Sequence, residues 1–266
     1  MSQPFARSGR DIFALALLLV YAFLAWSTQA GGGAASFDAT LVAAEARGSL
    51  RVAVDLGFRP FTDLQNSEPM GYDIDLARAV AAKLDLDVTF VPTGFDALYD
   101  TLVTGRADVI ASALPYAPEQ GFRARFSQIY FDAGQVLVAP RASSIAEVGD
   151  LATERVAVAL GSDADALARR LASTLPLRLD SNFDDAETAI AALAAGEVDA
   201  VIVDSVSALI ALAELSDLHI VAALSSEPYV LAVPYDAFQL QAEINRALDE
   251  LRAEGFFERL NEKWMR

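Results

Sequence analysis

The chain has 266 residues, 54% of them hydrophobic, and its 37 acidic residues against 20 basic ones give a formal net charge of −17. This charge would repel a phosphate backbone or an anionic membrane surface, so nucleic acid is not expected as a partner. The chain contains no cysteine, which excludes disulfides, thiol nucleophiles and thiolate metal sites. Its single histidine, His219, lies between apolar neighbours and is expected to be an ordinary strand residue, so we expect no metal, no cofactor and no histidine-based catalysis.

The N-terminus has the pattern of an export signal. Arg7 and Arg10 precede the apolar stretch 12–26, which small residues follow. Residues 1–30 are expected to be a cleaved signal peptide or a retained membrane anchor, because the apolar stretch is long for a signal peptide and approaches a membrane span. Residues 31–48 are expected to form a tether. In both cases the rest of the chain is periplasmic or otherwise extracytoplasmic.

The globular part begins as an alternation of strands and helices. The apolar run 50–54 predicts a strand, and Asp55 with the glycine- and proline-containing loop after it marks the strand exit. Residues 74–84 carry apolar side chains three and four apart and predict a helix, with Asp73 as its N-cap. The run 87–91 predicts the next strand.

A helix, a glycine and a strand then follow one another twice, in residues 98–116 and 189–205. In each copy the glycine, Gly105 or Gly196, ends the helix, and a short apolar run predicts a strand. Both strands run out into polar residues, and ligands bind at that end of open α/β sheets. The pattern is common in α/β proteins and a chance similarity stays open, but two copies favour two α/β lobes that share a cleft.

Several short motifs occur in a fixed order between residues 49 and 266. They are GYDIDLA at 71–77, FS at 126–127, GQVLV at 134–138, DL at 150–151 and LRAEGFF at 251–257. Together they resemble the bacterial solute-binding proteins of family 3, which are amino-acid-type periplasmic receptors of ABC importers.

The resemblance implies an α/β protein with the bilobal, type II periplasmic-binding-protein clamshell, in which two hinge strands join two α/β lobes. Lobe 1 would comprise 49–129 and 232–266, lobe 2 would comprise 135–226, and the hinge crossings would lie at 130–134 and 227–231. Such a hinge closes on a ligand. The resemblance further implies a monomer that binds a small molecule, such as an amino acid or an amine, and hands it to an ABC permease in the membrane.

The resemblance also places ligand-contacting positions on this chain. Asp204 matches the carboxylate that binds the α-amino group of a ligand, through a charge-assisted hydrogen bond. Without a ligand role, Phe58 and Phe95 would be core residues and Asp204 an exposed strand-end or helix-cap aspartate. The full set is Asp55, Phe58, Arg59, Phe95, Ser112, Ala113, Pro115, Gln120, Ser162, Asp163 and Asp204.

The positions that hold an α-carboxylate in amino-acid-binding members differ here. Gln120 stands where those members have arginine, and Pro115 stands where they have serine or threonine. Glutamine cannot form the charged two-donor fork of a guanidinium. Asp163 and Asp165 suit a helix N-terminus and would oppose an anionic group there. The sequence therefore predicts a preference for amines or cationic amino-acid derivatives.

Several alternatives stay open at this point. Arg59, Arg123 or Arg125 could replace the missing carboxylate-binding arginine. The chain could also be a ligand-sensing receptor component that acts through a separate partner. A periplasmic dehydratase on the same fold, with Glu119 or Asp204 as general acid, is disfavoured because the cleft arginine of such enzymes is missing. A binding protein, not an enzyme, is the favoured interpretation.

Overall fold

The computed structural model describes residues 38–265. The predicted signal peptide or anchor at 1–30, and the first part of the predicted tether at 31–37, lie outside the described residues. Within residues 38–265, no helix combines the length and the apolar character needed to cross a membrane.

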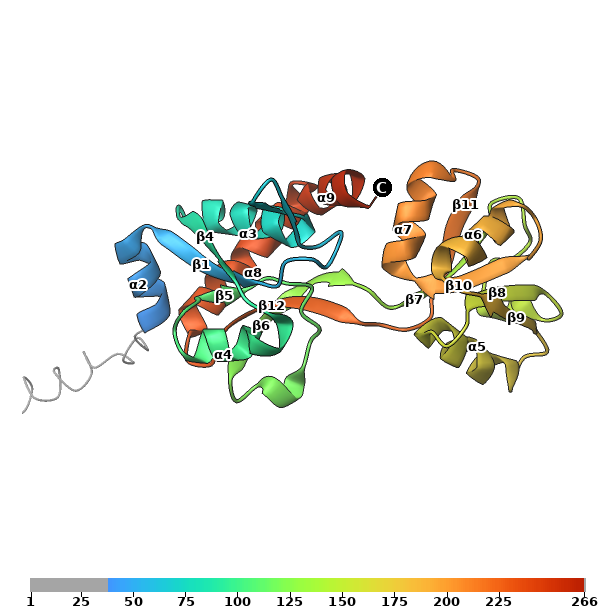
Figure 1. Ribbon diagram of the computed structural model, residues 1–266, viewed down its shortest axis with the longest axis horizontal. Coiled ribbons are helices and arrows are strands. Elements are labelled where there is room, and N and C mark those ends of the chain that lie inside the picture. Colours follow the sequence, from blue (N-terminus) through green and yellow to red (C-terminus); the bar gives the residue numbers. More distant parts are fainter. Residues whose placement is uncertain (1–37, 266) are drawn as a thin grey trace, which may run out of the picture. The chain divides into compact units, whose positions relative to one another are not determined.

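Lobe 1 is built on a five-stranded mixed sheet (Figure 1). Its strands are β1 (Ser49–Val54), β4 (Asp87–Pro92), β5 (Val109–Ile110), β6 (Ala124–Asp132) and β12 (Pro228–Pro234). The order is β4-β1-β5-β12-β6, in which β1 runs parallel to β4 and β5, and β12 runs antiparallel to β5 and β6. A short hairpin, β2 (Asp63–Gln65) and β3 (Glu68–Met70), follows β1.

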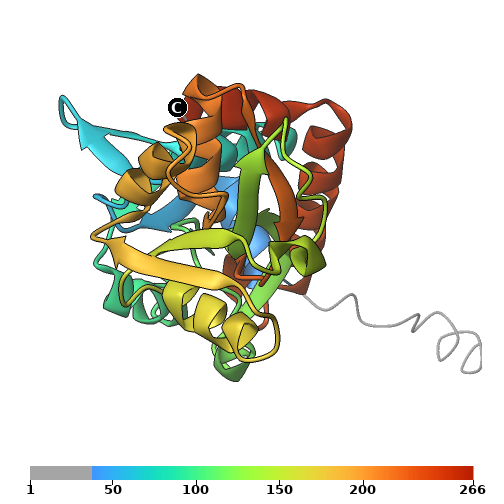
Figure 2. The ribbon, with the colours of Figure 1, turned by 90° about the vertical axis from the view of Figure 1, so that its right-hand side faces the viewer.

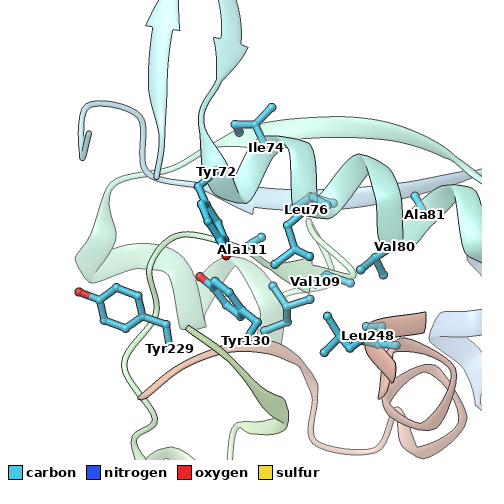
Figure 3. Close-up of a cluster of buried hydrophobic side chains, with 14 of the residues drawn as sticks. Tyr72, Ile74, Leu76, Val80, Ala81, Val109, Ala111, Tyr130, Tyr229 and Leu248 are labelled. Carbon is cyan, nitrogen blue, oxygen red and sulfur yellow. The ribbon is translucent and has the colours of Figure 1, made fainter. Parts of the chain in front are cut away.

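Helices cover both faces of this sheet because its strands are apolar on both sides. They are α2 (Ala39–Arg47), α3 (Tyr72–Lys83), α4 (Leu98–Val103), α8 (Phe238–Ala253) and α9 (Phe256–Trp264), with the short turns η1 (Phe95–Ala97) and η2 (Pro118–Gln120). On β1, Leu50 and Val52 pack into the core formed with α2, α3, α8 and α9, part of which Figure 3 shows. Ala53 points to the opposite face and packs with α4. This two-sided burial is typical of parallel strands.

Lobe 2 repeats the same pairing scheme. Its sheet has the order β11-β7-β10-β8-β9, in which β8 is parallel to β9 and β10, and β7 is antiparallel to β10 and β11. The strands are β7 (Gln135–Pro140), β8 (Arg155–Ala159), β9 (Arg178–Phe183), β10 (Ala200–Asp204) and β11 (Leu218–Ala223), and the helices are η3 (Val148–Leu151), α5 (Asp163–Ala172), α6 (Ala186–Ala194) and α7 (Ser205–Glu214). Helix α5 packs on one face of the sheet and α6 with α7 on the other (Figure 2).

The two copies of the helix–glycine–strand pattern form the predicted elements. Gly105 follows α4 with φ +67°, and Gly196 follows α6 with φ +75°, so both adopt the left-handed conformation that ends a helix. The strands that follow, β5 and β10, occupy the same position in their two sheets. The prediction of two α/β lobes from the repeat is confirmed.

A matching aspartate precedes the strand in each copy. Asp108 accepts the backbone N–H of Arg51, and Asp199 accepts the backbone N–H of Arg155, each at 2.8 Å. Asp108 is buried and also forms ion pairs with the side chains of Arg47 and Arg51. Each aspartate therefore ties the start of its strand to the strand beside it.

The predicted tether is wrong for residues 38–48, which are folded onto lobe 1. Asp38 is the N-cap of α2, and its second carboxylate oxygen accepts the backbone N–H groups of Gln239 and Leu240 at 2.9 Å each. Ala44 of this helix is fully buried in the lobe 1 core. The short helix is held by tertiary contacts with α8, which a sequence pattern does not reveal.

The prediction that Asp73 caps the following helix is also wrong. The helix α3 begins at Tyr72, and its N-cap is Gly71, which has φ +133°. A Cβ on Gly71 would lie 2.1 Å from the carbonyl oxygen of Phe61, so the chain must pass this point as glycine. Asp73 is thereby turned inward, where it is buried and accepts the backbone N–H of Ala113.

Two connections join the sheets. The first, 133–134, links β6 to β7, and the second, 224–227, links β11 to β12. The second lies before the predicted crossing at 227–231, because β12 already pairs with β6 at Pro228 opposite Asp132. Strand pairing therefore extends closer to the connections than the sequence indicated.

Asp132 holds the two connections together. Its carboxylate accepts the backbone N–H of Gly134 at 3.0 Å, the hydroxyl of Ser226 at 2.6 Å and the backbone N–H of Glu227 at 2.7 Å. These hydrogen bonds lower the pKa of Asp132 although its burial acts in the opposite direction. A Cβ on Gly134 would lie 2.2 Å from the carbonyl oxygen of Ser225, so the two backbones touch here.

Candidate functional site

A cavity of about 690 Å³ is lined by residues from both sheets and their helices. Lobe 1 contributes the loop after β1, with Phe58 and Arg59. Lobe 2 contributes the ends of β8 and β10 together with the starts of α5 and α7, including Ser162, Asp163 and Asp204. Strand ends and helix N-termini therefore meet at this cavity, as expected for an α/β binding site.

A second cavity of about 310 Å³ lies against the strand ends of lobe 1. Phe58, Glu227 and Tyr229 line both cavities, which makes the two neighbouring parts of one site. The other residues of the second cavity are Asp55, Phe95, Ser112, Ala113 and Pro115. Ten of the eleven predicted site residues thus line one cavity or both, and whether they contact a ligand stays a prediction.

Gln120 is the predicted residue that lines neither cavity. It belongs to the short turn η2, where its side-chain oxygen lies 3.5 Å from a guanidinium nitrogen of Arg123. Glu119, which the sequence offered as a general acid, is an exposed neighbour on the same turn and also lines neither cavity. The general-acid role is therefore unsupported at Glu119.

Parallel strand pairing brings the lobe 1 residues together. Asp55 follows β1 and Ser112 follows β5, and the two strands are neighbours in the sheet. The backbone N–H of Asp55 donates to the Ser112 hydroxyl at 2.9 Å, which joins the two strand ends. Phe58 is 52% exposed and Phe95 is 47% exposed, so the core-packing interpretation of these rings is wrong. They provide aromatic walls at the site instead.

Asp204 is both a helix cap and a cavity residue. It ends β10 and is the N-cap of α7, where its carboxylate accepts the backbone N–H of Ser207 at 2.8 Å and the Ser207 hydroxyl at 2.7 Å. Asp204 also lines the larger cavity. The bonds to Ser207 orient the carboxylate and leave it lone pairs for a further donor.

The N-terminus of α5 is occupied by the chain's own carboxylate. Ser162 is its N-cap, and the hydroxyl accepts the backbone N–H of Asp165 at 3.1 Å while donating to the carbonyl of Ala159 at 2.7 Å. Asp165 in turn accepts the backbone N–H of Gly161 at 3.1 Å and pairs with Arg169 at 2.9 Å. An incoming anionic group would compete with Asp165 for these donors.

Carboxylates dominate the charge of the site. Burial raises the pKa of Glu227, and the negative charges of Asp163, Asp132 and Asp204 raise it further. Glu227 was not predicted from the sequence, because its place depends on where the chain crosses between the sheets.

Within residues 38–265, no group of three or more His, Cys, Asp or Glu side chains is arranged to hold a metal ion. The six carboxylates that line the cavities are Asp55, Asp163, Asp184, Asp185, Asp204 and Glu227.

Arg59 is the one basic side chain, among the described residues, that lines either cavity. It is 79% exposed and pairs with Asp63 at 2.7 Å. The guanidinium is therefore largely in water, and a carboxylate on the adjoining hairpin already offsets part of its charge.

The other two candidate arginines are engaged away from both cavities. Arg123 forms an ion pair with Asp100, and Arg125 lies over the ring of Phe238 at 3.6 Å. The contacts of both arginines are therefore with other residues of lobe 1, outside the two cavities. The site therefore has an excess of negative charge, with six carboxylates against Arg59 as the one basic side chain that lines it among the described residues.

The family model of the bacterial extracellular solute-binding proteins, family 3, matches residues 50–266. The chain belongs to this family. The probable amino-acid-binding protein YxeM of Bacillus subtilis (strain 168) is 31% identical over 258 residues, which cover 93% of each chain. Members of this family are solute-binding proteins, so a binding role is assigned and an enzymatic one is not.

Solved structures show the same fold. The unliganded, open L-cystine solute receptor of Neisseria gonorrhoeae aligns with a TM-score of 0.73 at 26% identity, covering 85% of this chain and 96% of that one. An ancestral cationic amino acid solute-binding protein aligns with a TM-score of 0.65 at 31% identity, covering 86% of this chain and 100% of that one. The bilobal clamshell implied by the sequence motifs is confirmed by these structures and by the two mixed sheets.

Proposed function

We propose that the protein is an extracytoplasmic substrate-binding protein that captures a small amine-bearing solute and delivers it to an ABC importer in the membrane. Membership of the extracellular solute-binding family supports the binding role and the location. The ABC permease as partner rests on the resemblance to receptors of ABC importers. The protein acts as a monomer, since each chain contributes both walls of its own site.

The charge of the site carries the proposal about the ligand. Six carboxylates line the two cavities, and Arg59, the basic side chain beside them, is paired with Asp63. An ammonium group between such carboxylates gains charge-assisted hydrogen bonds, whereas a carboxylate brought there would be an unpaired charge in a partly dehydrated site. The ancestral relative named as a cationic amino acid binder is consistent with this preference.

Each part of the site has a role in this proposal. Asp204 and Glu227 receive ammonium groups, and the rings of Phe58 and Phe95 pack on the aliphatic part of the ligand or on a cationic end. The two connections joined by Asp132 act as the hinge on which the lobes close. When the site is empty, the carboxylates around Glu227 repel one another. A bound ammonium group neutralises this charge and so favours the closed state.

The proposal is tested with a ligand panel. We expect L-arginine, L-lysine, putrescine and amino-acid amides to raise the melting temperature more than L-glutamate or L-aspartate does. A ligand at a hundred times its Kd stabilises the native state by about 2.7 kcal/mol. Calorimetric titration then gives the affinities, and closure should reduce the radius of gyration in small-angle scattering.

Variants make the test specific. Asp204→Asn and Glu227→Gln should each weaken binding of a cationic ligand by about 1.5–3 kcal/mol, the usual contribution of a hydrogen bond to a charged group. The exposed Asp236, which lines neither cavity, provides the matched control Asp236→Asn, which should leave affinity unchanged. Tight binding of glutamate that is abolished by Arg59→Ala would instead show that Arg59 binds a carboxylate, and the proposed preference would be wrong.

A further inference from the structure

Asp73 is a buried carboxylate that the binding site does not itself contain. Its exposed fraction is 0%, and it lies in the first turn of α3 behind the wall of the smaller cavity. One carboxylate oxygen accepts the backbone N–H of Ala113, and the other has no hydrogen-bond partner among the described residues. Burying a carboxylate whose second oxygen has no hydrogen-bond partner lowers the stability of the fold, so we expect the bond to Ala113 to have a functional role.

Ala113 is in a conformation that needs support. Its φ is +42°, which lies in the left-handed region that residues with a Cβ rarely adopt. Ala113 and its neighbour Ser112 line the smaller cavity, and the Ser112 hydroxyl accepts the backbone N–H of Asp55 at 2.9 Å. A continuous path therefore runs from the Asp73 carboxylate through this turn to the strand end at Asp55.

The groups around Asp73 come from four elements. Figure 3 shows Tyr72, on its own helix α3, and Tyr130, on β6, with their hydroxyl ends pointing toward one another, and the two rings stack at 6.3 Å. The hydroxyl of Tyr130 also lacks a hydrogen-bond partner of ordinary geometry within residues 38–265. Tyr229 on β12 and Glu258 on α9 also act on this cluster, and the carboxylates Glu227 and Asp204 act on Tyr229. None of these groups is a basic side chain, so none of them offsets the charge of the carboxylate.

We propose that Asp73 is a positioning residue for ligand binding, because it holds the Ser112–Ala113 turn in the conformation that forms the cavity wall. The assignment of a binding role to that wall rests on the proposed function. The hydrogen bond itself is a property of the fold and can be measured without a ligand.

The state of the carboxylate changes near neutral pH. Burial raises the pKa of Asp73 to about 7, while the hydrogen bond from the backbone N–H of Ala113 and the nearby hydroxyl of Tyr130 act in the opposite direction. Above that pH the ionised carboxylate accepts from Ala113 more strongly, and below it the neutral acid accepts more weakly. The turn at the cavity wall should therefore tighten as the pH rises through neutrality.

The first experiment follows the backbone amides of the ¹⁵N-labelled protein by NMR between pH 5 and pH 9. The amide of Ala113 should titrate in the neutral range in the wild type and should not titrate in Asp73→Asn, which keeps an acceptor oxygen and removes the charge. In Asp73→Ala, hydrogen exchange at Ala113 and Asp55 should accelerate at least tenfold more than at other strand amides. An unchanged titration in Asp73→Asn would overturn the proposal.

The second experiment measures the affinity for L-arginine at pH 6. Asp73→Ala should weaken it at least tenfold, and Asp73→Asn should restore it to within threefold of the wild type. Asp38 provides the control, because it is 2% exposed in the same lobe but caps α2 and does not line the site, so Asp38→Ala should leave the affinity within threefold. Equal losses in Asp73→Ala and Asp38→Ala would reduce Asp73 to a general stabilising role.

The two proposals fail in different ways. If the wild type binds neither L-arginine nor any other cationic ligand of the panel while the Ala113 amide responds as described, the proposed function is wrong and the placement of the turn by Asp73 stands. If L-arginine binds and the Ala113 amide ignores the Asp73 variants, the positioning role is wrong and the proposed function stands.

Discussion

Asp108 and Asp199 offer a comparison within one molecule, because the internal repeat gives them the same backbone hydrogen bond in different surroundings. Each accepts the N–H of an arginine on the neighbouring strand at 2.8 Å. The side chain of Asp108 is 1% exposed and pairs with two arginines, whereas that of Asp199 is 39% exposed and lies 3.7 Å from the side chain of Arg155. Truncation to alanine should therefore cost far more at Asp108.

The magnitudes follow from these surroundings. Breaking a buried ion pair from one side costs about 3–5 kcal/mol, but the two arginines beside Asp108 are about a third exposed and can turn to water. We therefore expect Asp108→Ala to lower the free energy of unfolding by about 3 kcal/mol. Asp199→Ala removes a backbone hydrogen bond and a weakly paired, exposed charge, for about 1 kcal/mol.

Thermal unfolding followed by circular dichroism measures both. For a protein of this size about 1 kcal/mol corresponds to a shift of about 2–4 °C in Tm, so Asp108→Ala should lower Tm by about 6–12 °C and Asp199→Ala by about 2–4 °C. Asp108→Asn, which keeps one acceptor, should fall between the wild type and Asp108→Ala. Equal shifts for the two alanine variants would show that the shared backbone bond, and not burial with ion pairing, sets the contribution.

Two further predictions concern the connection between the sheets and the buried carboxylate of lobe 1. Gly134→Ala should destabilise the protein by more than about 2 kcal/mol in thermal unfolding, because its Cβ would lie 2.2 Å from the carbonyl oxygen of Ser225. The control Gly94→Ala, whose Cβ would have nothing within 4 Å, should be nearly neutral. Similar unfolding of the two glycine variants would contradict the close approach at Gly134. The pKa of Asp73 rises from an ordinary 3.8 to about 7 on folding, so between these pH values the unfolded state binds fewer protons than the folded state. The free energy of unfolding should therefore fall by up to about 1.4 kcal/mol per pH unit as the pH rises from 4 to 7. Urea unfolding at several pH values should find this slope smaller in Asp73→Asn, and an unchanged slope would assign it to other groups.

The sequence by itself determined the class of fold and most positions at the site. Periodic apolar residues and the left-handed glycines Gly105 and Gly196 are local signals, and they predicted the two helix–glycine–strand units correctly. Because ligands bind at the carboxyl ends of strands in open α/β sheets, Asp55 and Asp204, which follow predicted strands, were candidates for the site of their own lobe, and the family resemblance then placed both in one cleft. The order of short motifs then indicated the family.

Only the tertiary structure decided which side chains are free to act there. Glu227 joins the site because the chain crosses between the sheets beside it, and no local pattern marks such a crossing. Arg59 is drawn to Asp63 on the adjoining hairpin, and Asp73, predicted as a helix cap, is turned inward to Ala113 by the close approach at Gly71. These outcomes depend on contacts between residues far apart in the chain or on the exact path of the backbone, whereas sequence periodicity reports only which face of an element is apolar.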